Sequence, residues 1–277
     1  MLKQRVITGL ILVSAFAGSL LVLPALVFVA LTGAVILLGA WEWGRLAGLA
    51  SPAQRSAYVA VVAAFMAAYH WSAVGQPVAL LAVAAGWWLL MLFWVLDYPA
   101  SARRWNNRPV VLFMGVMALL PAWIALYWLL GREQGAHWLA LVVAVVASAD
   151  IGAFFGGRAF GRRRLAPAVS PGKTWEGVLC GMSLALLVGV ACAPGLGIAG
   201  KDGLYWLALI LATSFAGVLG DLGESMIKRA RGVKDSGSVL PGHGGVLDRV
   251  DSLSAALPVF VLGIATLGFS RALVAPG

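Results

Sequence analysis

Charged residues are scarce in this 277-residue chain, since only 11% are Asp, Glu, Lys or Arg whereas 61% are hydrophobic. Soluble domains carry about 25% charged residues, so the composition excludes an ordinary water-soluble protein. The alternating polar and apolar pattern of a membrane β-barrel is also missing. Cysteine is rare, and Cys180 and Cys192 lie in one apolar stretch, which excludes a disulfide framework or a cysteine metal site. Both fit small packing residues.

Long apolar runs dominate the sequence instead. A helix needs about 20 apolar residues to cross a bilayer, and it satisfies its own backbone hydrogen bonds there. The sequence therefore predicts an all-α, polytopic integral membrane protein with about nine transmembrane helices, the third of them short for a full crossing. The first run lacks a cleavage site and is interpreted as an uncleaved span. The nine runs are Val6–Leu23, Ala25–Leu46, Ala57–Tyr69, Val78–Leu96, Val110–Leu130, His137–Phe155, Val178–Pro194, Leu204–Gly220 and Leu253–Leu273.

The basic residues predict the orientation of these spans. With the N-terminus in the cytoplasm, every Lys and Arg except Arg132, Lys201 and Arg271 falls on the cytoplasmic side. Nine spans then place the C-terminus outside. This asymmetry explains the net charge of +9, so we expect no nucleic-acid partner. The acidic residues gather on the same side, except Glu133 and Asp202, although carboxylates contribute little to orientation. A site on the cytoplasmic face would explain their position.

The two halves of the chain differ in polarity, although we expect them to form one integral membrane unit. Residues 1–135 comprise N-terminal transmembrane helices with few polar features. Residues 136–277 contain two stretches, 150–181 and 220–251, that are dense in glycine, charge and hydroxyl groups. The sequence therefore predicts that the C-terminal helices carry the catalytic site.

The stretch 220–251 contains equal numbers of acidic and basic residues, unlike a loop that only fixes topology. Its acidic residues include two pairs spaced three apart, which on a helix share one face. Carboxylates at a membrane surface are costly unless a cation neutralises them, and oxygen-only ligands suit Mg²⁺. A solvated loop with local salt bridges remains the alternative. The predicted Mg²⁺ ligands are Asp221, Glu224, Asp248 and Asp251.

A glycine-rich segment at 241–245 separates the two carboxylate pairs. Glycine lets the backbone approach a ligand closely and point its amides at an anion. We therefore expect this segment and the neighbouring cations to bind phosphate groups. The candidates are Lys228, Arg229, Lys234, Gly242, His243, Gly244, Gly245 and Arg249.

A second polar block covers 170–177. Its Gly-Lys-Thr triplet is not part of a P-loop, because Pro167 occupies the position of the first glycine. Ser170, Lys173 and Thr174 are expected to open a helix, with Pro171 early in it, and a helix N-terminus beside a lysine is an anion site. An ordinary capping turn is the alternative.

Asp150 lies within or just below an apolar span. An acidic residue at this depth is a candidate for a functional role, here in substrate binding. A hydrogen bond to Ser148 or to another helix would explain it equally well.

The spacing of these motifs resembles a known signature, that of the bacterial phosphatidate cytidylyltransferases, also called CDP-diglyceride synthases. The residues 170–177, Asp150 and the N-terminal Trp41-Glu-Trp43 are similar to that family as well. The signature comprises Ser225-x-Ile-Lys-Arg229, Lys234-Asp235, Leu240-Pro-x-His-Gly-Gly245 and Asp248-Arg249-x-Asp251.

The resemblance implies that CTP and phosphatidic acid react to give CDP-diacylglycerol and pyrophosphate, with Mg²⁺ as cofactor. It also implies a homodimer in the bacterial inner membrane with a cytoplasmic active site. The residues that we then expect to be catalytic are Lys173, Asp221, Lys228 and Asp248.

Two rival functions share some of these features. A CTP-dependent lipid kinase would transfer the γ-phosphate and release CDP. A transporter would place its polar residues near the midplane and is often built from repeats, whereas here they lie at one surface and no repeat is evident.

Overall fold

The computed structural model describes residues 11, 14–72, 77–198, 200, 202–237, 239 and 244–267. Residues 14–22 are helical. The elements that follow are α2 (Ala25–Leu46), α3 (Pro52–Trp71), α4 (Val78–Leu96), α5 (Ala102–Trp105), α6 (Arg108–Leu130), α7 (Gly135–Phe160), β1 (Arg164–Ala166), β2 (Ser170–Thr174), α8 (Trp175–Cys192), the 3₁₀ turn η1 (Pro194–Leu196), α9 (Asp202–Ala230) and α10 (Leu247–Leu267).

The described chain is mostly helical, and seven of its helices are long and apolar enough to cross a membrane. These seven are α2, α4, α6, α7, α8, α9 and α10, so the prediction of a multi-pass helical membrane protein is confirmed. Helix α3 contains the short third run and extends beyond it at both ends, but it is not among the seven. Part of the first run, residues 6–10, 12 and 13, lies outside the described residues. The count of nine spans stays a prediction.

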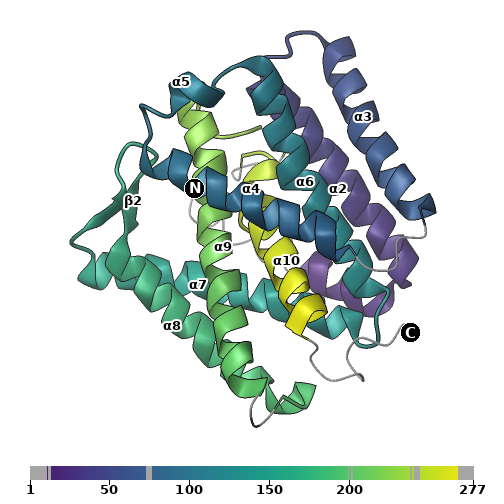
Figure 1. Ribbon diagram of the computed structural model, residues 1–277, viewed down its shortest axis with the longest axis vertical. Helices are drawn as coiled ribbons and strands as arrows, with labels where there is room; N and C mark the ends of the chain where they lie inside the picture. The colour runs from purple at the N-terminus through teal and green to yellow at the C-terminus, as the bar shows by residue number, and fades with distance from the viewer. Residues whose placement is uncertain are drawn as a thin grey trace.

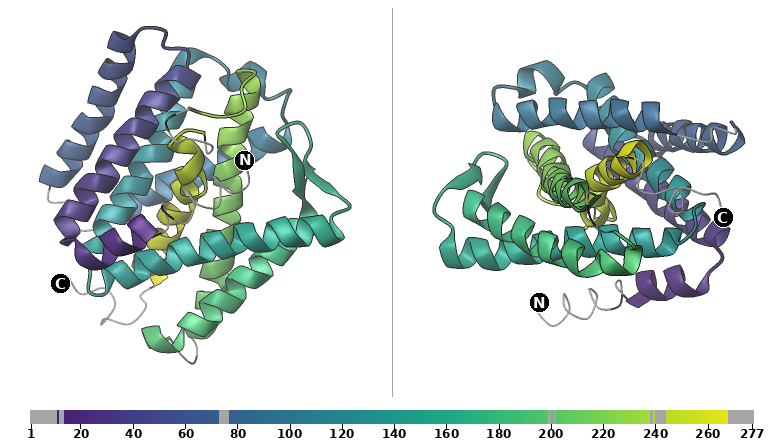
Figure 2. Two further views of the ribbon diagram at one scale, coloured as in Figure 1. Left: turned by 180° about the vertical axis from the view of Figure 1, so that it is seen from behind. Right: turned by 60° about the horizontal axis from the view of Figure 1, so that its bottom comes forward.

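Helices α9 and α10 form the centre of the molecule. They pack along each other and lie between α4 on one side and the α7–α8 pair on the other (Figures 1 and 2). Helices α2, α3 and α6 pack together beside them, and both α2 and α6 contact α10. The stretch 220–251 therefore lies at the centre of the bundle, and the hairpin of the stretch 150–181 contacts α9 from the edge.

A small antiparallel hairpin corrects the purely α-helical prediction. Strands β1 and β2 pair with Arg164 opposite Thr174, so Ser170 and Lys173 lie on a strand rather than in the first turn of a helix. Helix α8 begins only at Trp175, with Thr174 as its N-cap accepting a hydrogen bond from the backbone of Gly177 at 3.1 Å. The expected place of Pro171 early in that helix was wrong. Residues 170–174 pair with β1 instead, and the helix starts only where the side chain of Thr174 can cap it.

Helices α9 and α10 extend beyond the apolar runs that predicted them. Helix α9 continues ten residues past Gly220, to Ala230, and α10 begins at Leu247 instead of Leu253. Hydropathy marks only the apolar part of a helix, while the polar turns continue because their side chains find partners in neighbouring elements. Both carboxylate pairs are consequently helical, as the spacing predicted.

Glycines allow α7 and α8 to approach each other closely. A Cβ added at Gly152 would lie 2.9 Å from the carbonyl oxygen of Cys180, and one added at Gly181 would overlap the carbonyl oxygen of Ala149. Both obstacles are backbone atoms, which cannot rotate away. A larger residue at either position would therefore push the two helices apart.

We expect Gly181→Ala to lower the thermal unfolding midpoint of the detergent-solubilised protein, because overpacking costs about 1–3 kcal/mol. Gly86→Ala is the matched control, since Gly86 also lies within a helix but has no atom within 4 Å of an added Cβ. Alanine favours a helix over glycine at both positions, so only crowding differs. Equal midpoints for the two variants would contradict the close packing.

Candidate active site

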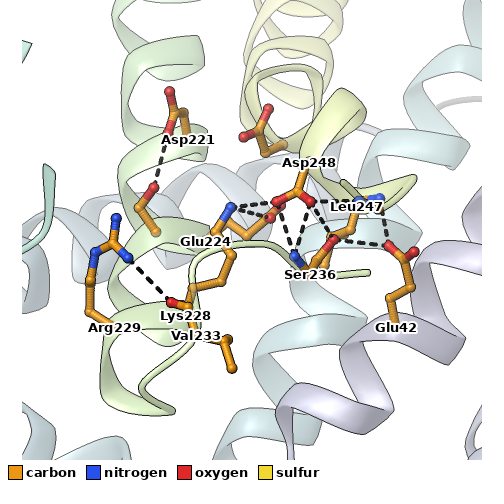
Figure 3. Close-up of polar contacts among 12 residues, drawn as sticks. Glu42, Asp221, Glu224, Lys228, Arg229, Val233, Ser236, Leu247 and Asp248 are labelled. Carbon is orange, nitrogen blue, oxygen red and sulfur yellow. Dashed lines mark hydrogen bonds and ion pairs between the residues drawn. The ribbon is translucent and has the colours of Figure 1, made fainter. Parts of the chain in front are cut away.

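Lys228 on α9 forms the most buried ion cluster that the structure describes. Its Nζ lies 2.9 Å from Glu224 Oε1 and 2.6 Å from Asp248 Oδ1 on α10 (Figure 3). The side chains of these three residues are 3–9% exposed. Buried charges need close partners to offset their lost hydration. Lys228 therefore joins one carboxylate of each predicted pair and connects the two central helices.

Asp248 also organises the loop that precedes it. Its Oδ2 accepts hydrogen bonds from the backbone N–H of Gly245 at 2.7 Å, and from the backbone N–H and hydroxyl of Ser236 at 2.9 and 3.0 Å. Ser236, in the segment after α9, and Gly245, the last residue of the glycine-rich segment, are thus tied to one carboxylate. Gly242 and His243, both predicted to bind phosphate, lie outside the described residues.

A second ion pair joins the hairpin to α9. Lys173 Nζ on β2 lies 2.7 Å from Asp221 Oδ2, and the Ser225 hydroxyl donates to Asp221 Oδ1 at 3.1 Å. Asp150 on α7 and Asp251 on α10 each interact electrostatically with both members of this pair. Sequence segments up to about one hundred residues apart are therefore brought together, as the prediction of one shared pocket requires.

The other predicted phosphate ligands are placed differently. The guanidinium of Arg229 donates to the backbone oxygens of Val169 and Val233, both at 3.2 Å, so it fastens the hairpin and the turn after α9. Lys234 and Arg249 are exposed, and Gly244 has the positive φ of 80° that glycine readily adopts. Ser170 lies at the far end of β2, opposite Ala166.

The alternative partner considered for Asp150 is engaged locally. The hydroxyl of Ser148 donates to the carbonyl oxygen of Val145 at 2.9 Å, one turn back along α7. Asp150 instead takes part in the electrostatic cluster with Lys173 and Asp221.

Glu42 on α2 is a residue of this region that sequence reasoning missed. It is only 4% exposed, and its carboxylate accepts hydrogen bonds from the backbone N–H groups of Val246 and Leu247 at 3.1 and 2.9 Å. The hydroxyl of Ser236 also donates to it at 3.0 Å. An acidic residue within an apolar run is itself a signal, and the same rule that singled out Asp150 would have found Glu42.

The carboxylates supply oxygen ligands of the kind that Mg²⁺ prefers, but they are not preassembled as a metal cage. Within the described ranges, no group of three or more His, Cys, Asp or Glu side chains is placed to hold a metal ion. Both oxygens of Asp248 already accept hydrogen bonds, whereas the buried Oε2 of Glu224 has no hydrogen-bond partner among the described residues. The metal role of these residues stays a prediction.

Comparison with known proteins identifies the family. Residues 3–267 match the model of the "Cytidylyltransferase family". Phosphatidate cytidylyltransferase of Pseudomonas aeruginosa is 48% identical over 261 residues, covering 94% of this chain and 96% of that protein. The Haemophilus influenzae enzyme of the same name is 38% identical over 280 residues, covering 94% and 97%. The resemblance drawn from the motifs is confirmed, and the chain belongs to the cytidylyltransferase family.

Proposed function

We propose that this chain transfers the cytidylyl group of CTP to phosphatidic acid, giving CDP-diacylglycerol and pyrophosphate. Its relatives are named phosphatidate cytidylyltransferases and cover nearly the whole chain. The observation that carries the proposal is that Lys173 and Lys228, from the hairpin and from α9, both pair with carboxylates of the central helices α9 and α10 within an apolar bundle. Lysines bind phosphates as point charges, and the apolar bundle gives a lipid substrate access.

The reaction needs positioning more than proton transfer. The phosphate of phosphatidic acid has a second pKa of about 6, so it is largely ionised at neutral pH and needs no general base. One of its oxygens bonds to the α-phosphorus of CTP, and the bond from that phosphorus to the β-phosphate oxygen breaks to release pyrophosphate. Electrostatic stabilisation dominates phosphoryl transfer, and we extend this to nucleotidyl transfer. Lys173 and Lys228 would hold the phosphates against their mutual repulsion.

The donor set fits Mg²⁺ with the substrate phosphates completing its coordination. Mg²⁺ is usually held by one or two carboxylates plus phosphates and water, so a cage of three protein ligands is not required. Asp221 is the leading ligand, with Glu224 and Asp251 as neighbours, while Asp248 holds Lys228 and the loop. The metal would supply neutralisation of the charge on the departing pyrophosphate.

The Lys173–Asp221 pair is suited to opening when substrate binds. Their side chains are 25% and 29% exposed, unlike the buried partners of Lys228. An anionic phosphate suits Lys173 and a cation suits Asp221, so a metal-bound nucleotide offers both groups a new partner. This pair is therefore the part of the site that we expect to exchange contacts.

We place the site at the cytoplasmic face of the bacterial inner membrane, and we expect the enzyme to work as a homodimer. The basic residues favour this orientation, and a cytoplasmic face would give the site direct access to CTP. The family resemblance is the support for the dimer.

Purified protein should convert CTP and phosphatidic acid into lipid-bound CMP, and the test uses CTP labelled on either the α- or the γ-phosphorus. Label should enter the lipid from the α-position and appear in pyrophosphate from the γ-position. Excess chelator should abolish the reaction and added Mg²⁺ should restore it. Transfer of the γ-label to lipid would indicate a kinase instead, and full activity in chelator would remove the metal from the mechanism.

Loss of either partner of the partly exposed Lys173–Asp221 ion pair should impair the reaction. We expect Asp221→Asn to reduce kcat at least about 100-fold, or about 2.7 kcal/mol. Lys173→Met should reduce kcat/KM for CTP at least about tenfold, or about 1.4 kcal/mol, with normal insertion and yield. The exposed pair Arg104 and Asp97 provides the control variants Arg104→Met and Asp97→Asn. Unchanged kinetics in folded Lys173→Met would return residues 170–174 to a structural role.

Reporter fusions test the orientation. A reporter fused after Gly232, just beyond α9, should be active in the cytoplasm, whereas one fused after Gly277 should report from the periplasm. The difference arises because one further span, formed by α10, separates the two positions. Reports from the same side would contradict the crossing of α10 and the nine-span arrangement.

A further inference from the structure

Glu42 brings a negative charge from the N-terminal half of the chain into the centre of the bundle. It lies on α2, about 200 residues before the loop that it contacts, and it points at Ser236 and at the first residues of α10 (Figure 3). A carboxylate that is 4% exposed is costly unless its oxygens are hydrogen-bonded. The three donors therefore hold the Glu42 carboxylate in place, and the carboxylate in turn holds the three donor groups in place.

The donors are those that a carboxylate stabilises most effectively. The N–H groups of Val246 and Leu247 lie at the start of α10, where backbone amides lack partners within the helix and the helix dipole favours an anion. Glu42 thus caps α10 from a different helix. Arg45, one turn later on α2, donates to the carbonyl oxygen of Ser236 and adds a second tie.

The backbone around Glu42 leaves no space for other side chains. A Cβ at Gly237 would overlap Glu42 Oε1, and a Cβ at Gly245 would overlap both Glu42 Oε2 and the hydroxyl of Ser236. Glycine at both ends of the loop is therefore what permits the carboxylate to approach.

Ser236 connects Glu42 with the catalytic cluster. Its hydroxyl lies 3.0 Å from Glu42 Oε2 and 3.0 Å from Asp248 Oδ2, so the two carboxylates share one hydroxyl group. Asp248 in turn contacts Lys228 at 2.6 Å. The contacts run without a break from Glu42 through Ser236 and Asp248 to Lys228, and the single hydroxyl proton of Ser236 lies between the two carboxylates.

We propose that Glu42 is a positioning residue: it holds Ser236 and the first turn of α10 so that Asp248 keeps Lys228 in place for the substrate phosphates. This inference rests on the proposed function for its catalytic part. The contact of Glu42 with the loop and α10 is independent of that function.

Glu42→Gln tests the proposal with little change of volume. The amide keeps one acceptor oxygen, but its NH₂ group would face an N–H or hydroxyl donor. Two measurements are made on the detergent-solubilised full chain, namely kcat and backbone hydrogen exchange over residues 236–250. We expect kcat to fall at least about tenfold and exchange in this segment to become faster, with the thermal midpoint little changed. Asp97→Asn, which removes an exposed carboxylate, is the control and should change neither quantity.

A double-mutant cycle with Ser236→Ala separates positioning from general packing. If Glu42 acts through Ser236, the double variant should lose little more activity than either single variant, whereas independent effects would multiply. Multiplying effects, or unchanged kcat in a variant with faster exchange, would overturn the positioning role. Unchanged exchange would overturn the contact itself. Absence of product from the unmodified protein would overturn the proposed function and the catalytic role of Glu42, and the exchange measurement would still test the contact.

Discussion

The buried ion cluster around Lys228 is the interaction on which the rest of the site depends. Two carboxylates from different helices meet one ammonium group in the interface between α9 and α10. Removing Lys228 would cost about 3–5 kcal/mol, because it would leave two carboxylates uncompensated away from water. The cluster therefore fixes the rotation of α9 relative to α10, and with it the direction in which Asp221 and Asp251 face.

The same cluster also holds Ser236 and Gly245, which lie on either side of the loop between α9 and α10. Asp248 uses one oxygen for Lys228 and the other for the backbone amides of Ser236 and Gly245. Glu42 holds the adjoining segment from the opposite side. Residues of both halves of the chain thus act on one loop, and the N-terminal half contributes more than apolar spans.

Much of the fold follows from the sequence because a bilayer leaves few alternatives to the helix. The runs Ala25–Leu46 and Val78–Leu96 coincide with α2 and α4. The sequence was misleading at residues 164–174, where two prolines and a glycine permit a hairpin that no hydropathy pattern marks. It also placed the start of α10 too late, since Asp248 and Asp251 interrupt the apolar pattern of the first turns, whose leading backbone amides donate to a carboxylate from α2.

The candidate site could be predicted in its composition but not in its pairing. Helical spacing placed Asp221 with Glu224, yet the structure gives each of them a different lysine. The Glu224–Lys228 pair follows from i,i+4 spacing on α9, whereas the Lys173–Asp221 and Lys228–Asp248 pairs are set by how separate elements pack, which the local sequence does not encode. The hydrogen-bond partners of Glu42 were harder still to predict, because two of its three donors are backbone amides, which any residue supplies.

The pairing of lysines with carboxylates has a physical reason that connects the structure with the proposed chemistry. A site made only of cations would bind a polyphosphate well, but when empty it would hold several like charges within a bundle of low polarity, at a high electrostatic cost. Pairing each lysine with carboxylates removes that cost. It would also make the site complementary to the proposed substrate, a nucleotide bound to a metal ion, which carries both signs. In the proposed reaction the partly exposed Lys173–Asp221 pair would exchange partners, while the buried cluster around Lys228 would keep its own. These two roles match the positions of the lysines. Lys173, whose partners would change, lies on a short hairpin at the edge of the bundle, whereas Lys228, whose partners would not, lies on the central helix α9.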